Sequence, residues 1–288
     1  MAFVNPFTVI SYLRSASFQR FLPDWIVSIT LVIYFFSIAE HAKPFERQFS
    51  LNDLTISYPF ATKERVTGPA CIVISFLVPA ITITLVSFIK SLRSSNSGQK
   101  VLHNLQISIL GLIISLSFNG VVTDILKNWI ANPRPDFLER CGARNDTPLD
   151  TLVDISVCTA PYGQTILIDG MRSTPSGHSS ISFSAMFYLS LWIYGQLRLS
   201  SSTASGLAPQ PLYKYIFAGL PILLASYIAL SRTQDYRHHF FDISLGSVIG
   251  IGFAITSYLR YYPSVWSIDP EKTNDELESA YGEPILPR

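Results

Sequence analysis

Residues 231–242 bring together side chains that could do chemistry, in a chain that otherwise carries few charges. Two histidines, two arginines and two aspartates lie within this segment, between two apolar runs. His238 and Asp242 are four residues apart, so on a helix they would share one face, and a carboxylate placed there could orient an imidazole and stabilise its charged form. With the arginines nearby, the segment could hold an anion beside a nucleophilic or basic histidine. A solvated loop between two helices would have the same composition.

The same segment leaves two assignments open. His239 is three residues from Asp242, so helical spacing alone permits either histidine to be the nucleophile. Asp235 could pair with an arginine, and we interpret it as a structural or loop residue.

A second segment that could bind an anion follows the third apolar run of the chain. Pro133 and Pro135 should end the preceding helix near Ala131, because a residue before proline avoids the helical region. Lys127 would then lie on the last turn, with Arg134 just past the end. Arginine offers a planar fork to a phosphate, and lysine a point charge. Basic residues that merely flank a membrane helix would give the same pattern.

A third segment, residues 175–180, opens the fourth apolar run. Ser176 is a suitable N-cap for a helix. Gly177 would let a ligand approach the backbone, where the unpaired amides of a first helical turn favour an anion. His178 lies at the same helix start and could donate a proton there. A serine-rich cap with an incidental histidine is the simpler interpretation of this segment alone.

Taken together, the three segments indicate a phosphate site with histidine chemistry. They supply three cations, backbone amides and two histidines. The sequence has no Cys/His cluster with the spacing of a metal site, no acidic cluster typical of Mg²⁺, and no Walker or Rossmann glycine pattern. We therefore expect no metal and no other cofactor.

The composition indicates a membrane protein. Only 14% of the 288 residues are charged, against roughly 25% in ordinary soluble domains, and the mean hydropathy is +0.31. The net charge of +1 gives no argument for a nucleic-acid partner. The fold class expected is an all-α integral membrane protein, a bundle of six transmembrane helices with the active site at one membrane face. The predicted spans are residues 25–39, 68–89, 105–122, 179–197, 215–230 and 240–259.

Six spans would place both termini on one side of the membrane and all three chemical segments on the other. The loop 90–100 contains three basic residues and no acid, which favours the cytosolic side for that loop and for both termini. The active site would then face the lumen or the cell exterior. We expect a cytosolic segment over residues 1–24, a phosphatase domain over 25–262, and an acidic, disordered cytosolic tail over 263–288. Gly246 and Gly250 form a GxxxG pattern that predicts helix packing in the sixth span.

The three segments resemble the three-part signature of the type 2 phosphatidic acid phosphatase superfamily, also called lipid phosphate phosphatases. The matching residues are Lys127-x6-Arg134-Pro135, Pro175-Ser176-Gly177-His178 and Ser231-Arg232-x5-His238-x3-Asp242. All three parts are complete, in order, and placed as expected relative to six spans, over roughly residues 25–260. The segment from Pro44 to Pro59 is more closely similar to the fungal diacylglycerol pyrophosphate phosphatases.

The resemblance implies a role for each matching residue. His238 would be the nucleophile that forms a phosphohistidine, and Asp242 would orient it, so the family spacing selects His238 over His239. His178 would protonate the leaving oxygen. The phosphoryl oxygens would be bound by Lys127, Arg134, Ser176, Gly177 and Arg232.

A lipid substrate fits a site at the membrane interface, where the phosphate sits while the acyl chains stay in the bilayer. Phosphatidic acid, diacylglycerol pyrophosphate and lysophosphatidic acid are the expected substrates, and Trp129, Phe137 and Tyr236 could border the site. An isoprenoid or sphingoid phosphate phosphatase, or a membrane phosphotransferase, could use the same residues. A six-span transporter is the non-enzymatic alternative, but it would need ionisable groups within the spans.

Two features of the long loop between the third and fourth spans bear on its location. A lumenal or extracellular loop would permit a disulfide between Cys141 and Cys158. The sequence Asn145-Asp146-Thr147 is a glycosylation sequon, which agrees with the same side of the membrane. An endomembrane (vacuole, endoplasmic reticulum or Golgi) or the plasma membrane is the expected location. The sequence gives no indication of the oligomeric state.

Overall fold

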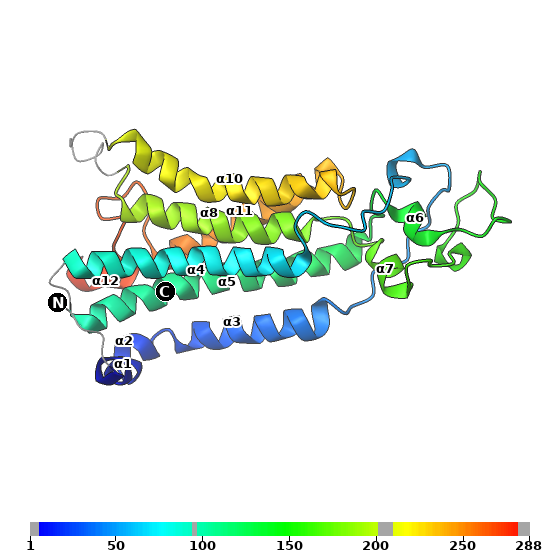
Figure 1. Ribbon diagram of the computed structural model, residues 1–288. Coiled ribbons are helices and arrows are strands. Elements are labelled where there is room, and N and C mark those ends of the chain that lie inside the picture. The colour runs from blue at the N-terminus through cyan, green and yellow to red at the C-terminus, as the bar shows by residue number, and fades with distance from the viewer. Residues whose placement is uncertain (1–5, 94–96, 201–209, 282–288) are drawn as a thin grey trace.

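The computed structural model describes residues 6–93, 97–200 and 210–281, and these residues form helices and no β-strand. Long helices run side by side, and shorter helices lie at both ends of the bundle (Figure 1). Isolated backbone bridges within the loops pair Phe49 with Val153 and Ala143 with Cys158. In chain order the elements are α1 (Pro6–Leu13), α2 (Ala16–Gln19), α3 (Leu22–Tyr34), η1 (Phe35–Ala39, a π-helical turn), η2 (Leu54–Ile56), α4 (Gly68–Arg93), α5 (Gly98–Ile130), α6 (Phe137–Cys141), η3 (Ile155–Val157), α7 (Gln164–Asp169), α8 (Gly177–Gln196), α10 (Leu212–Gln234), α11 (Phe240–Tyr261) and α12 (Asn274–Tyr281).

Within the described part of the chain, five helical stretches are long and apolar enough to cross a bilayer. They are α3 continued by η1, then α4, α5, α10 and α11. Each coincides with one of the predicted spans, although several extend further than the sequence indicated. The longest is α5, with 33 residues, which ends at Ile130 with Ala131 as a left-handed C-cap, as the following prolines predicted. The chain is therefore an all-helical protein with several membrane-type helices.

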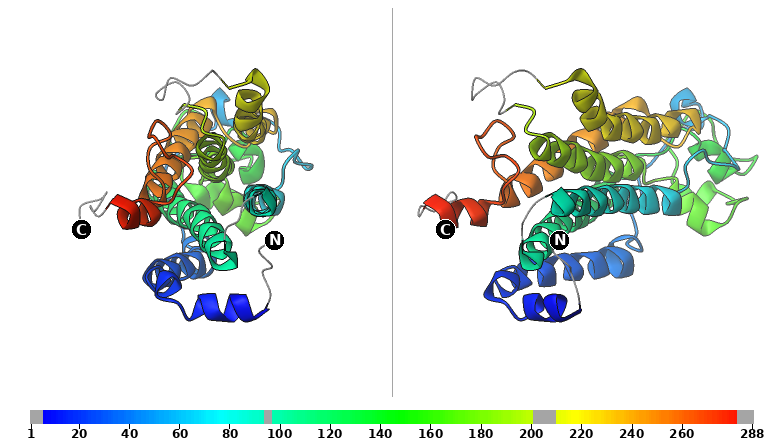
Figure 2. Two further views of the ribbon diagram at one scale, coloured as in Figure 1. Left: turned by 90° about the vertical axis from the view of Figure 1, so that its left-hand side faces the viewer. Right: turned by 60° about the vertical axis from the view of Figure 1, so that its left-hand side comes forward.

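The remaining predicted span, residues 179–197, corresponds to α8 (Gly177–Gln196), which occupies the centre of the bundle. It packs against α4, α5, α10 and α11, and the end-on view in Figure 2 places it near the middle of the molecule. Its serines are buried: Ser184 hydrogen-bonds Ser115 at 2.7 Å, and Ser190 donates to the carbonyl of Ala218 at 2.7 Å. Because this helix faces protein rather than lipid, it can contain many hydroxyl groups.

The contact between α8 and α11 depends on two glycines of α11. A methyl group on Gly246 would lie 2.5 Å from the backbone oxygen of Ser176, and one on Gly250 would lie 2.8 Å from the backbone nitrogen of Ser184. These distances are shorter than any real contact of a Cβ atom, so the two backbones touch along this line. The GxxxG pattern therefore packs α11 onto α8, as predicted.

The polar segments at one end of the bundle form a cap over it. The loop between η1 and α4 and the long segment between α5 and α8 lie together there (Figure 1). They share a small apolar core that includes Phe49, Phe137 and Leu167. A disulfide joins Cys141 to Cys158 within the cap, and Asn145 of the sequon is exposed.

The tail differs from its expected disorder. Residues 263–281 fold back onto the opposite end of the bundle, where α12 buries Leu277. Asp275 lies 2.8 Å from the imidazole of His103, and Glu278 lies 2.7 Å from the guanidinium of Arg20. The acidic residues that suggested a solvated tail instead pair with basic groups of α5 and of the α2–α3 junction. Residues 282–288, the rest of the predicted tail, lie outside the described residues.

Replacing Gly250 by alanine should destabilise the protein, because the added methyl group would collide with the backbone of α8. We expect Gly250→Ala to lower the free energy of unfolding by about 1–3 kcal/mol, the usual range for overpacking, as measured by thermal or chemical unfolding in detergent micelles.

Gly252 on the same helix provides the matched control, since a methyl group there would have no heavy atom within 4 Å. Gly252→Ala should leave the stability unchanged, or raise it slightly through the better helix propensity of alanine. Equal losses for both variants would contradict the proposed close approach.

Candidate active site

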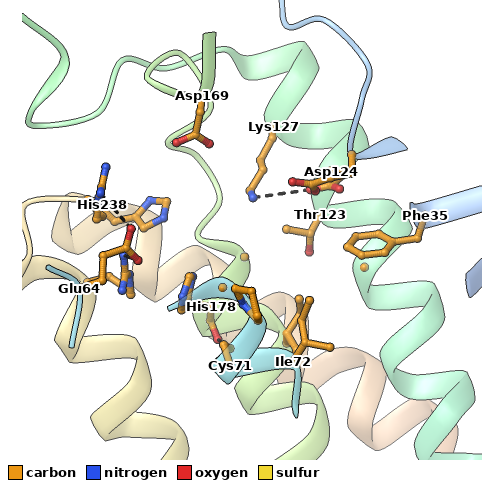
Figure 3. A pocket seen from close by; sticks show the side chains of 18 of the residues that line it. Phe35, Glu64, Cys71, Ile72, Thr123, Asp124, Lys127, Asp169, His178 and His238 are labelled. Carbon is orange, nitrogen blue, oxygen red and sulfur yellow. Dashed lines mark hydrogen bonds and ion pairs between the residues drawn. The ribbon is translucent and has the colours of Figure 1, made fainter. Parts of the chain in front are cut away.

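The three chemical segments meet in one cavity of about 400 Å³, which lies beneath the cap. Six of the eight predicted site residues line it, and the other two, Ser176 and Asp242, lie directly behind this lining. Figure 3 shows His238, His178 and Lys127 around this cavity. The six lining residues are Lys127, Arg134, Gly177, His178, Arg232 and His238.

His238 lies in the short connection between α10 and α11, and its two ring nitrogens face different surroundings. Nδ1 lies 3.4 Å from Oγ of Ser173 and 3.8 Å from Oδ2 of Asp242. Ser173 donates its own proton to Asp242 at 2.6 Å, so its oxygen is left to accept one from Nδ1. Nε2 lies on the other side, 3.3 Å from Nη1 of Arg134. This arrangement holds the proton on Nδ1 and keeps Nε2 unprotonated, with its lone pair accepting a hydrogen bond from Nη1 of Arg134.

The surroundings of His238 also keep its imidazole neutral. Its side chain is buried, and the guanidinium of Arg134 is close. Burial, and then the positive charge of Arg134, lower the pKa of His238 to about 3. The carboxylate of Asp242 raises the pKa of His238, but by less than burial and Arg134 lower it. A neutral imidazole with an unprotonated Nε2 is the form that can attack phosphorus.

His239 is occupied as a helix cap. Its ring Nδ1 lies 3.3 Å from Oδ2 of Asp242, and its backbone amide donates to the same oxygen at 2.9 Å, which forms a capping box at the start of α11. Its Nε2 donates to the carbonyl of Thr55 at 3.0 Å. The pKa of His239 is raised, chiefly by its hydrogen bond to Asp242. Since His239 does not line the cavity, the geometry favours His238 as the nucleophile.

The start of α8 brings the third segment to the cavity. Ser176 caps the helix by accepting from the amide of Ser179 at 3.4 Å, and its own amide donates to the carbonyl of Asp242 at 3.0 Å. A methyl group on Gly177 would lie 2.9 Å from Nζ of Lys127, so the glycine allows the lysine to reach the helix start. Nε2 of His178 donates to the carbonyl of Val66 at 3.1 Å, which fixes the orientation of the ring.

Every cation that lines the cavity has a carboxylate beside it. Nζ of Lys127 lies 3.6 Å from Asp124. Nη2 of Arg134 lies 2.8 Å from Asp169. Glu64 is 2.8 Å from Arg232 and also bridges to a fourth cation of the cavity, Arg237, at 2.9 Å.

Sequence reasoning missed these carboxylates and Arg237. Asp124 precedes Lys127 by one helical turn, and Arg237 adjoins His238, so both carried a local signal. Glu64 lies in the loop before α4, far from the three segments in the sequence. Asp169 ends α7, seven residues before Ser176, but no spacing pattern connects it to Arg134.

The other residues singled out near the site have structural roles. Asp235 is buried and pairs with an arginine, as predicted: its Oδ1 lies 2.5 Å from Nη1 of Arg65. The three aromatic residues expected at the border do not line the cavity. Trp129 is 75% exposed, Phe137 is buried in the core of the cap, and Tyr236 stacks on Tyr58.

An apolar groove of about 400 Å³ adjoins the polar cavity. It lies between α3, α4 and α5, and apart from Ser117 its walls are apolar residues and glycine. Several residues line both spaces, so the groove and the cavity meet. The shared residues are Phe35, Phe36, Ile72, Gly120 and Ile181.

Comparison with known proteins gives relatives along most of the chain. Diacylglycerol pyrophosphate phosphatase 1 of Saccharomyces cerevisiae is 42% identical over 245 residues, which are 85% of this chain and 80% of that protein. A probable diacylglycerol pyrophosphate phosphatase 1 of Schizosaccharomyces pombe is 37% identical over 85% of this chain and 83% of its own. Lipid phosphate phosphatase 2 of Arabidopsis thaliana is 29% identical over 85% of this chain and 79% of its own.

No solved structure matches the chain. The sequence model of the PAP2 superfamily matches residues 108–266, which include all eight predicted site residues. From this match and from relatives that align with most of its length, we conclude that the chain belongs to the PAP2 superfamily.

Proposed function

We propose that this protein hydrolyses the phosphate monoesters and pyrophosphates of membrane lipids. The observation that carries the proposal is the junction of a charged cavity around His238 with an apolar groove between α3, α4 and α5. A phosphorylated headgroup suits the first space and an acyl chain the second. The named relatives are diacylglycerol pyrophosphate phosphatases and lipid phosphate phosphatases, so diacylglycerol pyrophosphate and phosphatidic acid are the first substrates to test.

The reaction would proceed through a phosphohistidine. Nε2 of His238 attacks phosphorus, the bond to the leaving oxygen breaks, and His178 supplies the proton that this oxygen needs. Lys127, Arg134 and Arg232 surround the phosphoryl oxygens, with the backbone at Ser176 and Gly177, and stabilise the charge that develops on them. Water then attacks the phosphohistidine, passes a proton to His178, and releases inorganic phosphate. Asp242 stabilises the charged imidazole while the phosphoryl group is attached.

We further propose that α8 also crosses the membrane, in addition to the five helical stretches named above, which gives six spans. With 20 residues, α8 is long enough to cross the hydrocarbon core, and its neighbours on all sides are helices of the bundle. Six crossings would put the cap and the active site on the side opposite α1, α2 and α12. The basic loop 90–100 favours the cytosol for α1, α2 and α12, so the active site would face the lumen or the cell exterior. The disulfide of the cap is compatible with that side.

The nucleophile can be identified by trapping the phosphoenzyme. We expect His238→Ala to abolish both turnover and an acid-labile, base-stable phosphohistidine in rapidly quenched reactions with ³²P-labelled substrate. His239→Ala should retain the phosphoenzyme and show mainly a loss of stability, about 0.5–2 kcal/mol for the loss of a helix cap. A phosphoenzyme that persists in His238→Ala and is lost in His239→Ala would reverse the assignment.

Phosphate release should not need a metal ion. In the described parts of the chain, no three His, Cys, Asp or Glu side chains gather as metal ligands would. We expect purified protein in detergent micelles to release phosphate from diacylglycerol pyrophosphate and from phosphatidic acid in the presence of EDTA, at the rate seen with added Mg²⁺. A rate that collapses with EDTA and returns with Mg²⁺ would contradict this. Release from an isoprenoid or sphingoid phosphate alone would favour those substrates.

The proposed orientation can be tested at Asn145. If the cap is lumenal, the protein expressed in a eukaryotic host should shift in gel mobility after treatment with an N-glycosidase, and Asn145→Gln should remove the shift. A tag at the C-terminus should be accessible from the cytosolic side of sealed vesicles. A tag protected inside the vesicles would invert the topology.

A further inference from the structure

The loop that precedes α4 forms one wall of the catalytic cavity, and its backbone is firmly attached there. We call residues 58–67 the strap. At its start, Tyr58 donates its amide to the carbonyl of Pro135 at 2.9 Å and stacks on Tyr236. At its end, the carbonyl of Val66 accepts from Nη1 of Arg232 at 2.6 Å and from His178.

Further contacts hold the strap between these attachments. Phe60 lies under the guanidinium of Arg237, 4.4 Å from ring centroid to Cζ. The amide of Arg65 donates to Asp235 at 2.9 Å. The strap backbone is therefore fixed on both sides of Glu64, and the Glu64 side chain, which is 25% exposed, can change position by rotation alone.

Glu64 presents its carboxylate to two arginines that line the cavity. One oxygen lies 2.8 Å from Nη2 of Arg232 and the other lies 2.9 Å from Nη2 of Arg237. Figure 3 shows this carboxylate next to the ring of His238. A phosphoryl group bound beside His238 could place two of its oxygens on the same two guanidinium groups. The Glu64 carboxylate therefore occupies donors that a phosphoryl group could use.

The other carboxylates of the cavity are placed differently. The arginines of Glu64 each have a second, more distant carboxylate, Asp235 at 3.4 Å from Arg232 and Asp136 at 3.3 Å from Arg237. Asp169 also bridges two arginines, Arg134 and Arg140, but Arg140 lies outside the cavity and is held by Asp136 at 2.8 Å. Asp169 can therefore keep its position when an anion binds. Both partners of Glu64 line the cavity, so an anion at the nucleophile competes with Glu64 for the same donors.

We propose that Glu64 is an internal competitor for the phosphate position, which occupies Arg232 and Arg237 in the free enzyme and swings away when a phosphorylated ligand binds. The inference rests on the proposed function, because it assumes that the phosphate binds beside His238. Glu64 thus sets the affinity of the site for phosphate groups. When inorganic phosphate forms, the return of the carboxylate to its arginines helps to expel it.

The test measures the binding of inorganic phosphate directly. The full-length protein in detergent micelles is titrated with inorganic phosphate, and the apparent dissociation constant is taken from the rise of the thermal midpoint. We expect Glu64→Gln and Glu64→Ala to bind phosphate about tenfold more tightly, which corresponds to about 1.4 kcal/mol. In turnover assays we expect a lower KM, stronger inhibition by inorganic phosphate, and no increase in kcat.

Glu46→Gln serves as the matched control, because Glu46 is an exposed carboxylate in the same loop between η1 and α4. It should leave the phosphate affinity unchanged. Phosphate binding no tighter than wild type in both Glu64 variants would overturn the proposal, and so would an equal gain in Glu46→Gln, which would indicate a general effect of charge. Loss of folding in both Glu64 variants would also overturn it, because the carboxylate would then be structural.

The binding measurement needs no turnover, so it can fail separately from the proposed function. Tight phosphate binding without phosphatase activity would refute the reaction and leave the competitor intact. Normal phosphatase activity with unchanged phosphate affinity in the Glu64 variants would refute the competitor and leave the reaction intact.

Discussion

The structure depends on pairing the charges that are buried around one cavity. An unpaired charge would be costly to bury there, and each cation that lines the cavity has a carboxylate beside it. Asp242 is fully buried and accepts from Ser173, Thr174 and the amide of His239. These contacts tie α11 to the segment before α8 and to the α10–α11 connection. The matching of charge therefore positions the helices as well as the reactive groups.

This requirement explains which parts of the site could be predicted from the sequence. Groups that lie on one short segment, such as His238 with Asp242 or Ser176 with His178, revealed themselves by spacing. Most of the charges that balance the cations come from other parts of the chain: Asp124 shares α5 with Lys127, but only folding brings Glu64 to Arg232 or Asp169 to Arg134. Spacing within one segment identifies the candidate catalytic residues, whereas the carboxylates that neutralise the cations can be identified only from the folded structure.

The same contrast applies to the fold. The lipid-facing helices could be recognised by hydropathy, because the bilayer demands an apolar surface. The central helix α8 was also predicted, at residues 179–197, but the sequence did not show that it would be surrounded by protein. The partners of its buried serines, such as Ser115 for Ser184, appear only in the folded chain. The tail was misjudged for a related reason. Its acidic residues suggested solvent exposure, but their partners Arg20 and His103 lie far away in the sequence.

The glycine contact between α8 and α11 also has a consequence for the distance between the two reactive histidines. His178 is at the start of α8. His238 precedes α11, and Asp242, four residues later, lies in the first turn of that helix. The backbone bond from Ser176 to Asp242 fixes the two helix starts at the same level. A slip of one residue between the helices would move one histidine about 1.5 Å relative to the other. The close packing at Gly246 and Gly250 therefore helps to set the axial register in which His178 and His238 line the same cavity.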